Sequence, residues 1–224
     1  MPLWLKITWT AFAAVILAMY WRHYGPVNYL WFSDIALIGS VIAIWTQNRL
    51  LAGTMTVVVL FCEIGWNLSF FVGLLTGGYA PFGMASYMFD PQRPLHLRAL
   101  SLFHVPLPIL LIWMIRRWGY DRRAIAAATL LSSIVLPLSA LFSTEGQNVN
   151  WVYGLGQTQT WVPQWVWVAG LMIFLPAFVY TPTHRLLIRF FNNADLGEPN
   201  HAGAERSAAE RRPGSHDAHE TTAP

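Results

Sequence analysis

Three ionisable side chains interrupt the long apolar stretches of the sequence, and their types suit acid–base chemistry. Asp34, Glu63 and His104 each lie inside a run of mostly apolar residues. With the 1.5 Å rise per residue of a helix, Asp34 lies roughly 9 Å, His104 roughly 13 Å and Glu63 roughly 18 Å from the same boundary of these runs. Asn67 follows Glu63 by four residues and therefore shares its helical face. We expect the four groups to meet in one polar pocket.

A carboxylate beside an imidazole supports more than one kind of chemistry. Asp34 or Glu63 could orient His104 as a general base, with Ser33, Ser101 or a water molecule as the nucleophile. Alternatively, the two carboxylates, the imidazole and the neighbouring amide form a site for a proton or a cation. A metal is not predicted, because only one histidine lies deep in an apolar run. No motif of the sequence indicates a cofactor.

Each of these groups also has a purely structural interpretation. Asp34 can form an ion pair with Arg98 near the end of its run. Glu63 can be neutral and hydrogen-bonded to a neighbouring helix, because burial disfavours a charged carboxylate. His104 can be neutral, with Asn67 or a free backbone carbonyl as its partner. The similar depth of the groups, and no single residue, favours a functional site.

Two prolines indicate a kink beside His104. A proline lacks an N–H, so it leaves the carbonyl of the residue four positions earlier without its helical partner. Pro106 therefore frees the carbonyl of Leu102, and Pro108 frees that of His104. In hydrocarbon such carbonyls need a protein donor or a water-lined cavity.

The elements that carry these residues are predicted to be membrane-spanning helices. The chain is 55% hydrophobic and only 11% charged, whereas soluble domains have about a quarter of charged residues. About 20 mostly apolar residues suffice to cross a bilayer. The sequence therefore predicts an all-α integral membrane bundle of about six transmembrane helices, in the windows 3–21, 29–45, 51–75, 95–115, 124–142 and 165–180.

Basic residues at the ends of the windows predict the orientation of the bundle. If both termini are cytoplasmic, eight basic residues lie on the inner side and three on the outer side, as the positive-inside rule requires. The inner group is Lys6, Arg49, Arg116, Arg117, Arg122, Arg123, Arg185 and Arg189, and the outer group is Arg22, Arg93 and Arg98. The net charge of +3 is small and belongs to this topology pattern, so nucleic acid is not an expected partner.

The segments between and after the windows differ in character. Two outer loops, 76–94 and 143–164, combine polar residues with Tyr and Trp, so we expect them to cover the bundle at the headgroup level. The candidate binding residues are Asn67, Arg98, Asn150 and Trp151.

The C-terminal part of the chain is predicted to leave the bundle. Arg185 and Arg189 share one face of the segment RLLIRFF, which predicts a short interfacial helix. Residues 194–224 are polar and lack aromatic side chains, which is typical of disorder. The predicted organisation is a transmembrane domain over 1–193 and a cytoplasmic tail over 194–224.

Several stretches resemble a family of bacterial multi-pass proteins that are described only as membrane-associated. The resemblance implies a bacterial cytoplasmic (inner) membrane and brings no known activity with it. The stretches are NYLWFSDIALI (28–38), YMFDPQRPLHLRALSLFH (87–104), GYDRRA (119–124), NVNWVYGLG (148–156) and YTPTHRLL (180–187).

A fainter similarity is to the androgen-induced membrane hydrolases, six-helix enzymes that cleave fatty-acid esters of hydroxy fatty acids with a threonine and a histidine. His104 precedes a Leu-Pro pair at 107–108, as the family's histidine does, and a Trp-Val-Tyr follows at 151–153. The position of the family's threonine is Trp31 in this chain, two residues before Ser33. The resemblance implies a lipid-like substrate.

Three functions follow from these observations, and membrane lipid surrounds the protein in each. A structural or accessory membrane protein, which would bind a partner membrane protein, ranks first. A membrane-embedded enzyme that hydrolyses a lipid with His104 and Asp34 or Glu63 ranks second. A proton- or cation-linked binding or transport protein ranks last, because the sequence has no internal repeat of the transporter kind.

Overall fold

The computed structural model describes residues 1–191, and these fold into helices joined by turns. None of the described residues forms a β-strand, which confirms the all-α prediction. The predicted tail, 194–224, lies outside the described residues. The α-helices are α1 (Leu3–Tyr24), α2 (Phe32–Thr46), α3 (Arg49–Thr76), α4 (Leu95–Leu100), α5 (Pro106–Trp118), α6 (Ala124–Phe142), α7 (Gln164–Phe174) and α8 (Thr181–Phe191). The short helical segments are η1 (Pro26–Leu30), η2 (Pro81–Gly83), η3 (Ser86–Phe89), η4 (Ser101–His104), η5 (Val149–Trp151) and η6 (Leu175–Tyr180).

Five helical segments of the described chain, and not six, are long and apolar enough to cross a membrane. They are Leu3–Tyr24, Arg49–Thr76, Leu95–Trp118, Ala124–Phe142 and Gln164–Phe191.

The second predicted window, 29–45, forms a shorter helix than expected. Helix α2 has 15 residues, so it is about 22 Å long, whereas a bilayer core is about 30 Å thick. Pro26 begins the separate segment η1, which delays the start of α2 to Phe32. Gln47 ends the helix in the left-handed conformation, with φ 53°.

The last window does not end at residue 180. The helix predicted after it forms as α8, but it continues from α7, and its interfacial position stays a prediction. Helices α7 and α8 belong to one helical segment, Gln164–Phe191. A π-helical turn, η6, joins them and accommodates Pro176. The Thr181 hydroxyl donates a hydrogen bond to the Pro176 carbonyl at 2.8 Å, so the carbonyl beside the turn keeps a partner.

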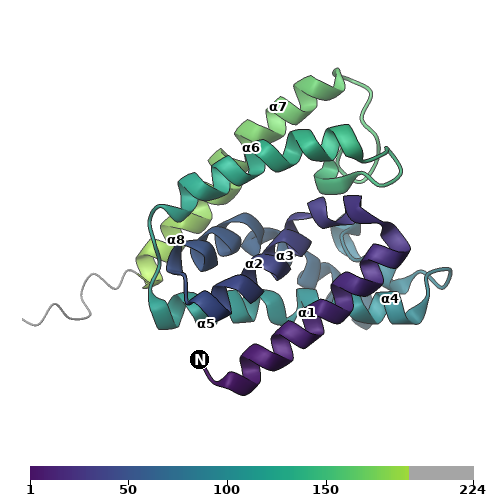
Figure 1. Cartoon of the computed structure of the whole chain (residues 1–224). Coiled ribbons are helices and arrows are strands. Elements are labelled where there is room, and N and C mark those ends of the chain that lie inside the picture. The colour runs from purple at the N-terminus through teal and green to yellow at the C-terminus, as the bar shows by residue number, and fades with distance from the viewer. Residues whose placement is uncertain (192–224) are drawn as a thin grey trace, which may run out of the picture. The chain divides into compact units, whose positions relative to one another are not determined.

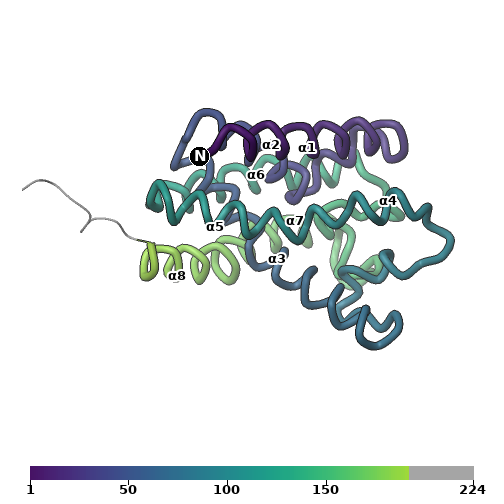
Figure 2. The backbone as a smooth tube through the Cα atoms, turned by 90° about the horizontal axis from the view of Figure 1, so that it is seen from below, coloured from purple at the N-terminus to yellow at the C-terminus, as the bar shows by residue number. Residues whose placement is uncertain are grey.

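Successive long helices run in opposite directions between two ends of the bundle (Figures 1 and 2). Helix α3 packs against α2, α5 and α6, so the side chains on several of its faces are enclosed. The side chains that are fully buried around it include Ile16, Leu37, Ile44, Leu107, Leu111 and Met114.

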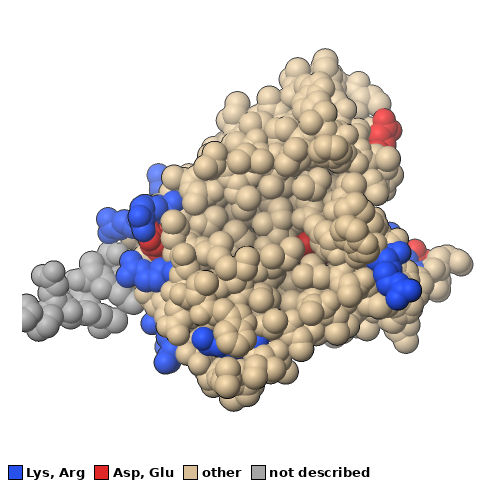
Figure 3. All heavy atoms as spheres, viewed as in Figure 1, with Lys and Arg blue, Asp and Glu red and all other residues tan. Residues whose placement is uncertain are grey.

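The charged side chains are separated from the apolar surface. Lys and Arg gather toward two ends of the molecule, and the broad surface between them is almost free of charge (Figure 3). Only 22–39% of the residues in the apolar windows are buried within the protein. Most of these apolar side chains therefore face outward, as lipid-exposed helices do.

Asn150 joins the loop 143–164 to the start of α2. Its side-chain oxygen accepts a hydrogen bond from the Phe32 backbone N–H at 3.1 Å. Its amide nitrogen donates to the Leu30 carbonyl at 2.7 Å and to the Ser139 hydroxyl at 3.0 Å. The side chain is 7% exposed, so these protein groups are its principal partners. The loop is thereby held against the bundle through segments that are distant in sequence.

We predict that Asn150→Ala lowers the free energy of unfolding by about 2–4 kcal/mol, because it leaves buried polar groups of α2 and α6 unpaired. Unfolding of the detergent-solubilised protein, followed by circular dichroism, measures this. Gln157→Ala, an exposed position of the same loop, should change the free energy by less than about 0.5 kcal/mol. Equal effects of the two substitutions would contradict the role given to Asn150.

Candidate functional site

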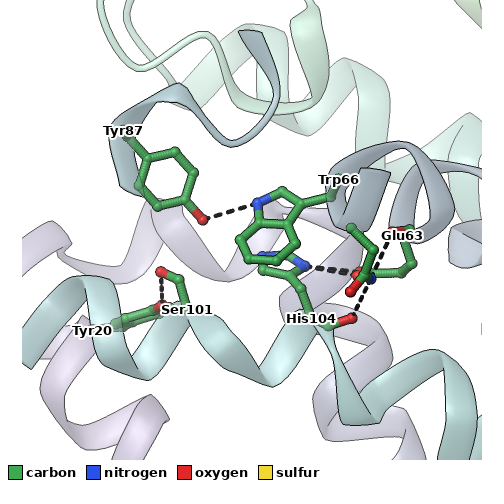
Figure 4. Close-up of polar contacts among 7 residues, drawn as sticks. Tyr20, Glu63, Trp66, Tyr87, Ser101 and His104 are labelled. Atoms are coloured by element: carbon green, nitrogen blue, oxygen red, sulfur yellow. Dashed lines mark hydrogen bonds and ion pairs between the residues drawn. The ribbon is translucent and has the colours of Figure 1, made fainter. Parts of the chain in front are cut away.

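Two of the three deep ionisable groups meet directly in the interior of the bundle. His104 Nδ1 lies 2.8 Å from Glu63 Oε2 and 3.1 Å from Glu63 Oε1 (Figure 4). The Glu63 side chain is 2% exposed and that of His104 is 12% exposed. A carboxylate from α3 and an imidazole from η4 therefore form a buried pair, which we call the Glu63–His104 pair.

The backbone around His104 is shaped by the two prolines that follow it. Helix α4 ends at Leu100, η4 continues as a 3₁₀ helix, and α5 begins with Pro106 in its first turn. The Leu102 carbonyl, which Pro106 leaves free, accepts a hydrogen bond from the Val105 N–H at 3.0 Å. The 3₁₀ geometry therefore supplies the donor that an α-helix with this proline lacks.

Asn67 satisfies the carbonyl that Pro108 leaves free. Its side-chain nitrogen donates to the His104 carbonyl and to the Glu63 carbonyl, each at 2.8 Å. The predicted need for a protein donor at His104 is thus met by a side chain one turn from Glu63. This amide and the Glu63–His104 pair together join α3 to the kinked part of the chain.

Aromatic rings enclose the imidazole on two sides. The Trp66 ring is stacked on His104 with centroids 4.5 Å apart, and the Phe103 ring lies at 4.2 Å. Trp66 also donates its indole N–H to the Tyr87 hydroxyl at 3.2 Å. The rings limit the access of water to the imidazole faces, so interactions of the ring nitrogens occur in a medium of low polarity.

Three hydroxyl groups lie across the Trp66–His104 stack from Glu63 (Figure 4). Tyr20 and Ser101 are hydrogen-bonded at 2.9 Å, and Ser101 donates to the Leu97 carbonyl at 3.2 Å. Because Ser101 has one hydroxyl proton, Tyr20 is the donor of the first bond.

The phenol of Tyr87 completes this group of hydroxyls. Burial raises the pKa of Tyr87 to about 12, against the lowering effect of the Trp66 hydrogen bond, and the charge of Glu63 raises it further. Tyr20, Ser101 and Tyr87 form what we call the hydroxyl cluster.

Asp34 does not join the other two ionisable groups. Its Oδ2 accepts a hydrogen bond from the Asn28 side chain at 2.9 Å, and its Oδ1 is buried with no partner among residues 1–191. Within that range no three His, Cys, Asp or Glu side chains form a group that could hold a metal.

The alternative ion pair of Asp34 with Arg98 is also wrong. Arg98 donates through Nη1 to the Met88 carbonyl at 3.0 Å. Among the described residues the ion pairs are Arg93–Asp90, His104–Glu63 and Arg123–Asp121. Arg98 therefore holds the loop before α4 and leaves Asp34 with its amide partner.

Among the described residues, no hydrogen bond joins the remaining candidates to the side chains of the Glu63–His104 pair. Ser33 is half-buried at the start of α2, and no hydrogen bond joins it or Ser101 to His104. The Trp151 carbonyl accepts a hydrogen bond from the Trp167 indole at 2.9 Å, and Asn150 is engaged with α2. The loop residues thus hold structure, and the predicted serine nucleophiles are not in place.

The sequence did not identify Trp66, Tyr20 or Tyr87 as neighbours of the Glu63–His104 pair. Trp66 follows Glu63 by three residues, so its position on the face of Glu63 was visible in the spacing. Tyr20 comes from α1 and Tyr87 from η3, and no local spacing relates them to His104.

Two hollows in the described chain have apolar walls and exclude the Glu63–His104 pair. One lies between α3 and α6, and the other is lined by Leu5, Trp9, Pro106, Ile109, Leu110 and Trp113 of α1 and α5.

No family model, curated protein or solved structure matches this chain. The two family resemblances drawn from the sequence therefore stay predictions.

The raised pKa of Tyr87 predicts a pH dependence of stability. The folded state keeps the phenolic proton up to about pH 12, whereas the unfolded state loses it near pH 10. The resulting stability is fully present below about pH 10 and is lost as the pH rises through about 12. It amounts to about 2–3 kcal/mol for a shift of this size.

We therefore expect Tyr87→Phe to reduce the fall in unfolding free energy between pH 9 and pH 12 by about 2–3 kcal/mol. Denaturant titrations of the solubilised protein at both pH values measure it. Tyr79→Phe, at a ring that is 70% exposed, is the matched control and should leave the fall unchanged. An equal fall in wild type and Tyr87→Phe would show that this phenol is not protected.

Proposed function

We propose that the chain is an integral membrane protein of the bacterial inner membrane, with residue 1 and the end of α8 on the cytoplasmic side. Five apolar helical segments supply spans, and the shorter apolar helix α2 returns the chain between α1 and α3 as a sixth pass. Six passes place residue 1 and the end of α8 on the same side. The larger group of basic residues follows the positive-inside rule for this orientation. The resemblance of the sequence to bacterial multi-pass proteins supports the choice of membrane.

We further infer that the Glu63–His104 pair is an acid–base site within the membrane core. With Glu63 ionised, Nδ1 must donate to the carboxylate, so Nε2 keeps its lone pair. Among residues 1–191 no hydrogen bond occupies Nε2. A proton taken up there makes the pair neutral overall, which a medium of low dielectric constant favours. The two short contacts between Nδ1 and the carboxylate are the observation that carries this proposal.

The favoured substrate class is an ester of an amphiphilic lipid. Nε2 would take a proton from water as the water oxygen attacks the ester carbonyl, and the imidazolium would return the proton to the leaving alkoxide. The products are a carboxylic acid and an alcohol. Water serves as the nucleophile because no hydrogen bond joins Ser33 or Ser101 to His104. The hydroxyl cluster, across the Trp66–His104 stack from Glu63, offers polar partners for the ester.

A structural or accessory role is the second candidate, and Asn67 favours it. Its amide bonds to carbonyls of both α3 and η4, and the Glu63–His104 pair crosses the same junction. In this proposal the polar groups hold a proline-kinked helix in place, and the protein acts through a partner in the membrane.

Turnover of lipid in vesicles distinguishes the two candidates. The full chain is reconstituted in phosphatidylethanolamine and phosphatidylglycerol with an added fatty-acid ester of a hydroxy fatty acid, and released acid is measured by mass spectrometry. If the pair is an acid–base site, Glu63→Gln, which keeps a hydrogen-bond acceptor, slows release at least about 100-fold. Glu145→Gln, the same change at an exposed loop position, should not.

The outcome must be read together with protein stability. Loss of turnover in Glu63→Gln with a nearly unchanged unfolding temperature supports the acid–base site. No release by wild type, together with a large loss of stability in Glu63→Gln, supports the structural role and contradicts hydrolysis.

A further inference from the structure

A second feature of the bundle, a groove between α3 and α6, lies apart from the Glu63–His104 pair. Its volume is about 460 Å³, within the roughly 300–1,000 Å³ typical of small-molecule sites. Its walls are apolar except for two polar residues near the start of α3. The lining residues are Asn48, Leu50, Leu51, Thr54, Met55, Ala127, Leu130, Leu131 and Ile134.

The groove begins beside a tight contact between α3 and the start of α6. A Cβ atom at Gly53 would lie 3.0 Å from the Ala124 Cβ and 3.3 Å from the Tyr120 ring, so the two helices touch through small residues there. The wall residues of both helices begin within one turn of this contact. The groove therefore runs from the end of the bundle along the outer, apolar surface.

The end of the bundle at which the groove starts is strongly basic. Seven exposed arginines belong to the helix ends and turns on this side, and Figure 3 shows Lys and Arg gathered at that end. Asp121 is the acidic residue of the described chain in these segments. The arginines are Arg49, Arg116, Arg117, Arg122, Arg123, Arg185 and Arg189.

The single acidic group does not cancel this charge. Arg123 contacts Asp121 at 2.8 Å and 3.1 Å, and these hydrogen bonds lower the pKa of Asp121, so the pair stays ionised and neutral overall. Arg123 precedes Ala127 by four residues and lies on the groove face of α6. The other six arginines leave a surplus of positive charge beside the mouth of the groove.

We propose that the groove binds an acyl chain of an anionic phospholipid whose phosphate lies against the arginines at the α3 and α6 starts. The apolar walls suit the acyl chain of the lipid, and the arginines suit the negative charge of its phosphate. Sites that bind anionic headgroups on the cytoplasmic face combine basic residues in this way. Inorganic phosphate alone would bind the arginines and leave the apolar groove empty. The site depends on the proposed membrane location but not on the acid–base site.

Native mass spectrometry of the full chain in detergent tests this, with phosphatidylglycerol and phosphatidylcholine of identical acyl chains as probes. Wild type should bind phosphatidylglycerol at least tenfold more tightly. Arg49→Gln/Arg122→Gln should reduce that affinity roughly tenfold to thirtyfold. Arg22→Gln/Arg93→Gln, the same changes at the opposite end, should leave it within twofold.

A second variant tests the groove separately from the charge. Ala127→Phe fills the groove at its wall, so it should lower the affinity for both lipids at least fivefold, and an unchanged unfolding temperature in detergent checks that the fold persists. Millimolar inorganic phosphate should not displace the lipid. Equal binding of the two lipids, unchanged phosphatidylglycerol binding in Ala127→Phe, or displacement by phosphate would each overturn the proposal.

Discussion

A carboxylate and an imidazole within the apolar interior must find each other, because an isolated charge there is far more costly than a hydrogen-bonded pair. Glu63 belongs to α3 and His104 to η4, so their contact fixes the central helix against the kinked one. Trp66, three residues after Glu63 on α3, stacks on the imidazole in this arrangement. The Trp66–His104 stack and the hydroxyl cluster lie beside this contact.

The same constraint explains the irregular backbone beside the pair. Pro106 and Pro108 remove two helical donors, and the chain replaces them by different means. A 3₁₀ turn supplies the Val105 N–H to one carbonyl, and the Asn67 side chain supplies the other. The polar groups of the kink thus find partners within the 3₁₀ turn and on α3.

The sequence predicted the helical bundle from its apolar runs and part of the polar site from the polar residues within them. Both patterns reflect the cost of burying charge in hydrocarbon. The meeting of Glu63, Asn67 and His104 was predicted from depth and helical spacing. Asp34 was placed at a similar depth but pairs elsewhere, since depth along a helix does not fix the direction around it. Tyr20 and Tyr87 could not be predicted, because loop paths and helix packing bring them in.

We expect Glu63 and His104 to stabilise each other across α3 and η4. A double-mutant cycle of Glu63→Gln and His104→Gln, on the unfolding free energy of the solubilised protein, isolates that interaction from the cost of each substitution. We expect a coupling energy of about 1.5–3 kcal/mol, as for hydrogen bonds to charged groups. A coupling below about 0.5 kcal/mol would contradict it, because the two side chains would then be stable without each other.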